Sequence, residues 1–119
     1  MIANRGLAMS QDIDALAREL ISELPALVFT TGDPVINYLA PNALHKLANL
    51  ETLRRTGQDD DAKRLIERDL RPTLAKLEEV LGELAKRAPA LDMAAVGRVM
   101  TLCREFQEAH PPELERSHG

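Results

Sequence analysis

The chain has 119 residues, of which 45% are hydrophobic and 29% are charged. A chain of this length fits one compact domain that buries roughly two-thirds of its unfolded surface, so folding requires neither a disulfide nor a structural metal. Its 15 basic and 19 acidic residues give a formal net charge of −4 at pH 7. This balance opposes non-specific binding to phosphate backbones or to anionic membranes.

Aromatic residues make up only 3% of the chain, and tryptophan is absent. The core must therefore consist mainly of leucine, alanine and valine, which favours helices over sheets. The scarcity of aromatic rings also disfavours a stacking platform for single-stranded nucleic acid.

Cys103 is the single cysteine, which excludes an internal disulfide and is consistent with a reducing compartment. The first ten residues lack the continuous apolar stretch of a signal peptide. No apolar run approaches the roughly 20 residues of a membrane span. We therefore expect a cytoplasmic protein that makes no membrane contact.

Residues 1–9 show no apolar pattern and are predicted to form a disordered N-terminal tail. Ser10 is a suitable N-cap for a first helix, in which apolar residues recur every three or four positions as far as Leu24. Proline disfavours the helical conformation of the residue before it, so Pro25 predicts that this helix ends at Leu24. Residues 25–32 favour a strand locally but have no second strand to pair with. They are predicted to form a buried crossing segment or an irregular helical turn.

Asp33 and Pro34 mark the start of a second helix, because a capping carboxylate precedes a proline at the first helical position. This helix is predicted to cover residues 34–56, to bend at Pro41 and to end at Gly57 in the left-handed conformation. A helix restarted at the internal proline would instead have an alanine as its cap, which is a poor one. The predicted apolar face consists of Ile36, Leu39, Ala43, Leu47 and Leu50.

Residues 59–88 have the clearest pattern in the chain. At about 100° per residue, the main apolar residues fall within an arc of roughly 140° on one side of a helix, with charged residues on the other side. Three aspartates open this helix at the positive end of its dipole. Pro72 lies opposite the apolar stripe, so the helix is predicted to bend there with the proline on its convex side and to end at Pro89. The stripe consists of Ile66, Leu70, Leu74, Leu77, Leu81 and Leu84.

A fourth helix is predicted to begin after a cap at Asp92 and to run to about residue 109, followed by a flexible tail over residues 111–119. The links on either side of the third helix are short, and short links make antiparallel neighbours. The sequence therefore predicts an all-α protein. Its single domain covers residues 10–110 and is an up-down four-helix bundle with kinks at the prolines of the second and third helices.

The fourth helix has the widest apolar face, which covers about half of its cylinder. The simpler interpretation is that this helix contacts two helices of its own bundle. The functional interpretation is a face for a second copy or another protein, with methionine as its adaptable element. The candidate interface residues are Met93, Val96, Val99, Met100, Leu102, Cys103 and Phe106.

Six basic residues cluster around the link between the second and third helices. Three of them share a helix face that could contact phosphates or an acidic partner. Five acidic residues are interleaved with the cluster, and Asp60 has ion-pair spacing to Arg64, so a solvated and self-paired face is the simpler interpretation. The cluster consists of Arg54, Arg55, Lys63, Arg64, Arg68 and Arg71.

Catalytic and metal chemistry find little support in the sequence. Cys103 lies within the apolar face of the fourth helix, where a free cysteine usually acts as a small buried hydrophobe. A nucleophile needs a neighbouring base, and neither His45 nor His110 can be placed beside this thiol. No two histidines are set four residues apart on a predicted helix, so no metal or cofactor is predicted. An enzyme would need a polar pocket built from Asp33, Tyr38, His45 or Cys103.

The leading interpretation is a non-catalytic helical protein-interaction module that acts as a homodimer, an adaptor or a small subunit of a larger assembly. It depends on the wide apolar face of the fourth helix and on the lack of a catalytic motif. The second interpretation is a nucleic-acid-associated accessory protein that uses the basic cluster. The third is an enzyme with the polar pocket described above.

Overall fold

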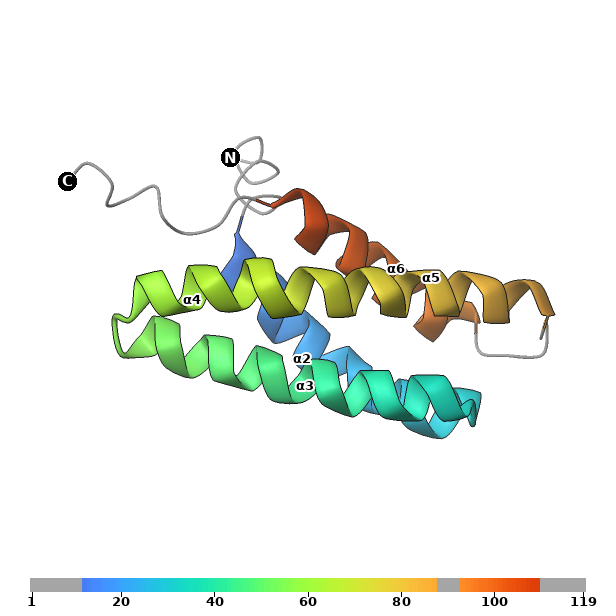
Figure 1. The fold of residues 1–119 in the computed structure, drawn as a ribbon. Coiled ribbons are helices and arrows are strands. Elements are labelled where there is room, and N and C mark those ends of the chain that lie inside the picture. The colour runs from blue at the N-terminus through green and yellow to red at the C-terminus, as the bar shows by residue number, and fades with distance from the viewer. Residues whose placement is uncertain (1–11, 88–92, 110–119) are drawn as a thin grey trace, which may run out of the picture.

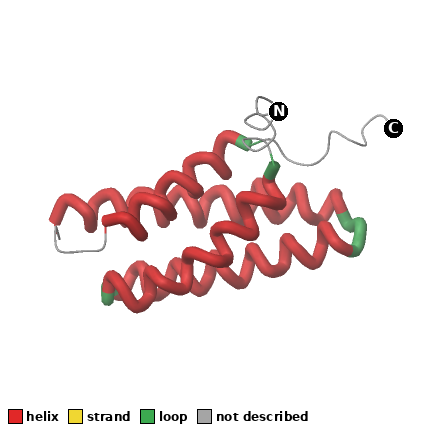
Figure 2. Tube along the Cα trace, turned by 180° about the vertical axis from the view of Figure 1, so that it is seen from behind, coloured by secondary structure: helices red, strands yellow, loops and turns green. Residues whose placement is uncertain are grey.

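The computed structural model describes residues 12–87 and 93–109. Its elements are α2 (Ile13–Thr31), α3 (Pro34–Arg55), α4 (Asp59–Leu65), the π-helical turn η1 (Ile66–Leu70), α5 (Arg71–Arg87) and α6 (Met93–Glu108). No strand occurs within these two ranges, as the colours of Figure 2 show. The predicted all-helical class is confirmed.

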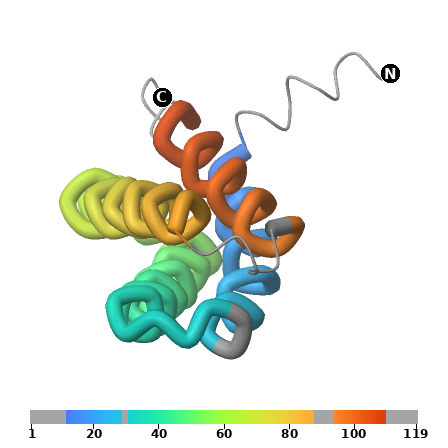
Figure 3. The backbone as a smooth tube through the Cα atoms, turned by 90° about the vertical axis from the view of Figure 1, so that its right-hand side faces the viewer, coloured from blue at the N-terminus to red at the C-terminus, as the bar shows by residue number. Residues whose placement is uncertain are grey.

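The described residues form four helical rods, because α4, η1 and α5 follow one another along one rod (Figure 1). α2 and α5 each pack against both α3 and α6, so the four rods surround a shared centre (Figure 3). α3 and α6 make no extensive contact with each other. The buried side chains form one apolar cluster, and over the described residues no polar or charged side chain is buried. The up-down order and the bends at the two prolines stay predictions.

α2 is longer than its sequence predicts. The prediction that the first helix ends before Pro25 is wrong, because α2 continues to Thr31 and ends at Gly32, whose φ is 63°. A proline in a helix interior costs about 3 kcal/mol. However, Pro25 is exposed, and the added helical turns bury Leu27 completely. Complete burial of a leucine contributes about 1.5–3 kcal/mol, and the regular hydrogen bonds of the added turns contribute further.

The N-cap of α2 is Asp12, whose carboxylate accepts a hydrogen bond from the N–H of Ala15 over 3.2 Å. The predicted cap, Ser10, lies two residues earlier and outside the described residues. An aspartate satisfies the free N–H groups of the first turn as well as a serine does, so residue type does not favour Ser10 over Asp12.

Both ends of α3 agree with the sequence. Asp33 accepts hydrogen bonds from two N–H groups of the first turn, and Pro34 occupies the first helical position. At the other end, Gly57 has a φ of 75°, and the N–H of Gln58 donates to the carbonyl of Leu53 over 2.8 Å. This hydrogen bond and the left-handed conformation of Gly57 form a Schellman-type helix end. The five residues of the predicted apolar face are all buried, and the internal proline is exposed.

The rod made of α4, η1 and α5 carries the predicted apolar stripe, and all six of its residues are buried. A π-helical turn lies directly before Pro72, where the N–H of Arg71 donates to the carbonyl of Ile66. Proline has no N–H with which to continue the α-helical ladder. Pro72 itself is exposed, and the rod ends at Arg87. The predicted end at Pro89 lies outside the described residues.

α6 agrees with the predicted fourth helix in its bounds. Its predicted cap, Asp92, lies outside the described residues, as do the predicted tails over residues 1–9 and 111–119. Within the described part of the chain, no helix is both long enough and apolar enough to cross a membrane.

Replacement of Pro25 by alanine tests the continuity of α2. Pro25→Ala is expected to raise the free energy of unfolding by about 2–3 kcal/mol. The substitution removes a helix penalty of about 3 kcal/mol. It also makes the unfolded chain more flexible, which lowers stability by up to about 1 kcal/mol. Urea unfolding followed by circular dichroism measures the change.

Pro34→Ala is the matched control for this substitution, because a proline at the first helical position carries no such penalty. It is expected to leave stability unchanged or slightly lower. A loss of stability in Pro25→Ala would mean that the first helix ends before Pro25, as the sequence predicted.

Candidate functional site

α6 turns its predicted interface residues into the core of its own chain. Leu102 is 8% exposed, and Met100 is half-buried against the core cluster. The side chain of Met93 lies outside the described part of the structure. α6 packs against both α2 and α5, which accounts for the width of its apolar face. The remaining four residues are fully buried: Val96, Val99, Cys103 and Phe106. An interface built on this set would require α6 to separate from the bundle.

Cys103 has the properties of a buried hydrophobe. Burial, with a smaller contribution from Glu78, raises the pKa of its thiol to about 12. The thiolate is the nucleophilic form of cysteine, and little of it exists at neutral pH with such a pKa. Because the folded-state pKa lies above that of an exposed thiol, the stability due to the neutral thiol is complete below about pH 8.5. It is lost as the pH rises from there toward 12.

Cys103 lies on a different helix from the other residues that an enzyme would need. Asp33 caps α3 through hydrogen bonds to its first turn. Tyr38 and His45 are exposed on α3, whereas Cys103 is buried on α6, which makes no extensive contact with α3. His110 lies outside the described residues. Across the two described ranges, no group of three or more histidine, cysteine, aspartate or glutamate residues is placed to hold a metal ion.

Arg54 joins three helices through its guanidinium group. It donates to both carboxylate oxygens of Asp14 on α2, through Nε and Nη2 over 3.0 Å each. Its Nη1 donates to Asp59 on α4 over 2.9 Å. The hydrogen bonds to Asp14 raise the pKa of Arg54 above its ordinary value, although partial burial opposes the shift. Arg54 therefore stays charged and is held by carboxylates. No spacing rule pointed to Asp14 as the partner, because it lies forty positions from Arg54.

The rest of the basic cluster is partly paired. Arg64 forms an ion pair with Asp61, whereas the spacing had pointed to Asp60. A surface cavity of about 380 Å³ beside Arg54 has equal numbers of acidic and basic side chains, which leaves it without a preference for anions. Three other members form no ion pair with any described residue: the exposed Arg55 and Arg68 and the half-buried Lys63.

Arg71 connects the centre of the long rod to the end of α6. Its guanidinium donates to the backbone carbonyl of Ala109, and its Nη1 lies 3.9 Å from the carboxylate of Glu67. The side-chain amide of Gln107 donates to the carbonyl of Arg71 over 3.0 Å. A cation beside the last carbonyls of a helix is favoured by the helix dipole. Arg71 therefore fixes α6 to the rod, and its Nε is buried without a hydrogen-bond partner.

The outer side of α3 was not identified from the sequence. Seven exposed residues lie within an arc of roughly 100° on this helix, at 100° per residue. None of them carries a formal charge at pH 7, with histidine counted as neutral. We call this surface the uncharged α3 face; it consists of Pro34, Tyr38, Pro41, His45, Ala48, Asn49 and Thr52.

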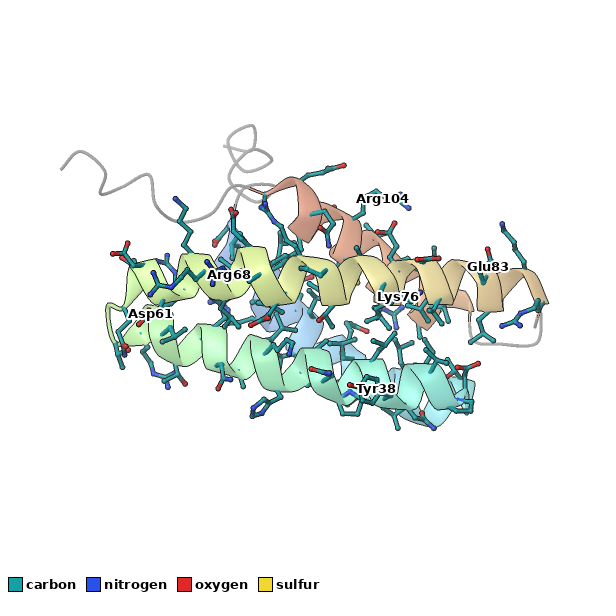
Figure 4. All side chains as sticks on the ribbon, in the orientation of Figure 1. Tyr38, Asp61, Arg68, Lys76, Glu83 and Arg104 are labelled. Carbon is teal, nitrogen blue, oxygen red and sulfur yellow. The ribbon has the colours of Figure 1, made fainter. Side chains whose placement is uncertain are left out.

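Two exposed large hydrophobic residues lie on or beside the uncharged α3 face. Tyr38 is 67% exposed, and Val35 at the edge of the face is 47% exposed; they are the large hydrophobic residues that stand exposed in the described ranges. Figure 4 shows Tyr38 on α3, and it shows Arg68, Lys76 and Glu83 along the neighbouring rod. The sequence feature that could have identified this face is the absence of charged residues over positions 34–45, in a chain that is 29% charged.

No protein-family model, curated protein or solved structure matches this chain. Its function is therefore inferred from its own residues and contacts.

Replacement of Arg54 tests whether the basic cluster serves the fold. Arg54→Gln is expected to lower the free energy of unfolding by about 1–3 kcal/mol, because hydrogen bonds to charged groups contribute about that much and because two carboxylates lose their shared cation. Arg64→Gln is the matched control. Its ion pair is exposed, so the expected loss is below about 0.5 kcal/mol. Equal losses in urea unfolding would contradict the role assigned to Arg54.

Proposed function

We propose that this chain is a non-catalytic protein-interaction module that works as a homodimer, an adaptor or a small subunit of a larger assembly. The observation that carries the proposal is the uncharged α3 face, with the exposed Tyr38 on it and Val35 at its edge. Interface cores are depleted in charged residues, and tyrosine is enriched at the positions that dominate binding energy.

The interior of the bundle supports the same proposal. Every residue classed as buried in the described ranges is apolar or is Cys103, whose thiol stays neutral. Catalysis needs positioned polar groups in a site that excludes water. Here the polar groups lie at the surface, and several of them are paired across helices, as Arg54 is with Asp14 and Arg98 is with Glu23. These pairs favour a stable scaffold with its function on its outer surface.

We further propose that the scaffold is an up-down bundle with bends at Pro41 and Pro72. Only residues 56–58 separate α3 from α4, and such a short link favours antiparallel neighbours. The order of colours along the rods in Figure 1 is consistent with this order. Both prolines are exposed, which suits the outer side of a bend. The single free cysteine suits a cytoplasmic location.

A nucleic-acid role draws less support from these contacts. Arg54, Arg64 and Arg71 already contact carboxylate groups. Phosphate binding would have to replace those contacts, and the net charge of −4 opposes it over longer distances. We therefore do not propose this role.

Affinity capture from an extract of the host tests the proposed function. The intact chain is expected to retain a protein in fixed ratio, either a second copy of itself or another chain. Tyr38→Glu is expected to lose it, because an unpaired charge in the centre of an interface is strongly unfavourable. Mass spectrometry and quantitative staining of the retained material provide the measurement.

Ala75→Glu is the matched control, because Ala75 is exposed on α5 and the substitution adds the same charge. It is expected to retain the protein. Capture of nothing, or capture that is equal in Tyr38→Glu, would contradict the proposal. Retention of nucleic acid that is lost in Arg68→Glu would favour the basic cluster instead.

A further inference from the structure

We draw no further inference here: the strongest candidate, the uncharged α3 face on the outer side of the bundle, is an exposed helix surface, and nothing in the structure shows what covers it.

Discussion

The burial of one apolar stripe on each rod is the constraint on which the rest of the structure depends. Every rod must place its stripe at the shared centre, and the buried residues of all four rods form one apolar cluster. The positions of the internal prolines satisfy this constraint. Pro25, Pro41 and Pro72 are all exposed, so none of them interrupts a buried stripe. Charged side chains are confined to the rim, where Arg54 joins three helices without entering the core.

Much of this fold could be predicted from periodicity, because apolar spacing directly records which side of a helix is buried. The rule for Pro25 failed because it is local, whereas the burial of Leu27 depends on the other rods. Local sequence rules also do not predict the π-helical turn. Four-residue steps in an α-helix each drift by about 40°, and the wider π turn rotates the chain less per residue. It therefore helps to keep a run of four-residue steps on one side: Ala62, Ile66, Leu70 and Leu74.

The candidate surfaces were predicted less completely than the core. The sequence offered two interpretations for the wide apolar face of α6, and only the packing of α6 against both α2 and α5 explains its width. The pairing of Arg54 with Asp14 depends on a contact across forty positions, which spacing rules along one helix do not cover. The uncharged α3 face consists of residues that form no motif. The feature that identifies this face is the absence of charge, which becomes informative once the fold shows that these residues are exposed.

The central claim is that the four rods form one cooperative core, and Cys103 reports on it directly. Its thiol is fully buried between rods, so a thiol reagent should reach it only when the core opens. The decisive measurement is the free energy of opening obtained from the labelling rate of Cys103 at pH 8, compared with the free energy of unfolding obtained from urea. We predict that the two values agree within about 1 kcal/mol, as expected for a single two-state domain. A labelling value several kcal/mol lower would show that α6 opens by itself and would contradict a shared core.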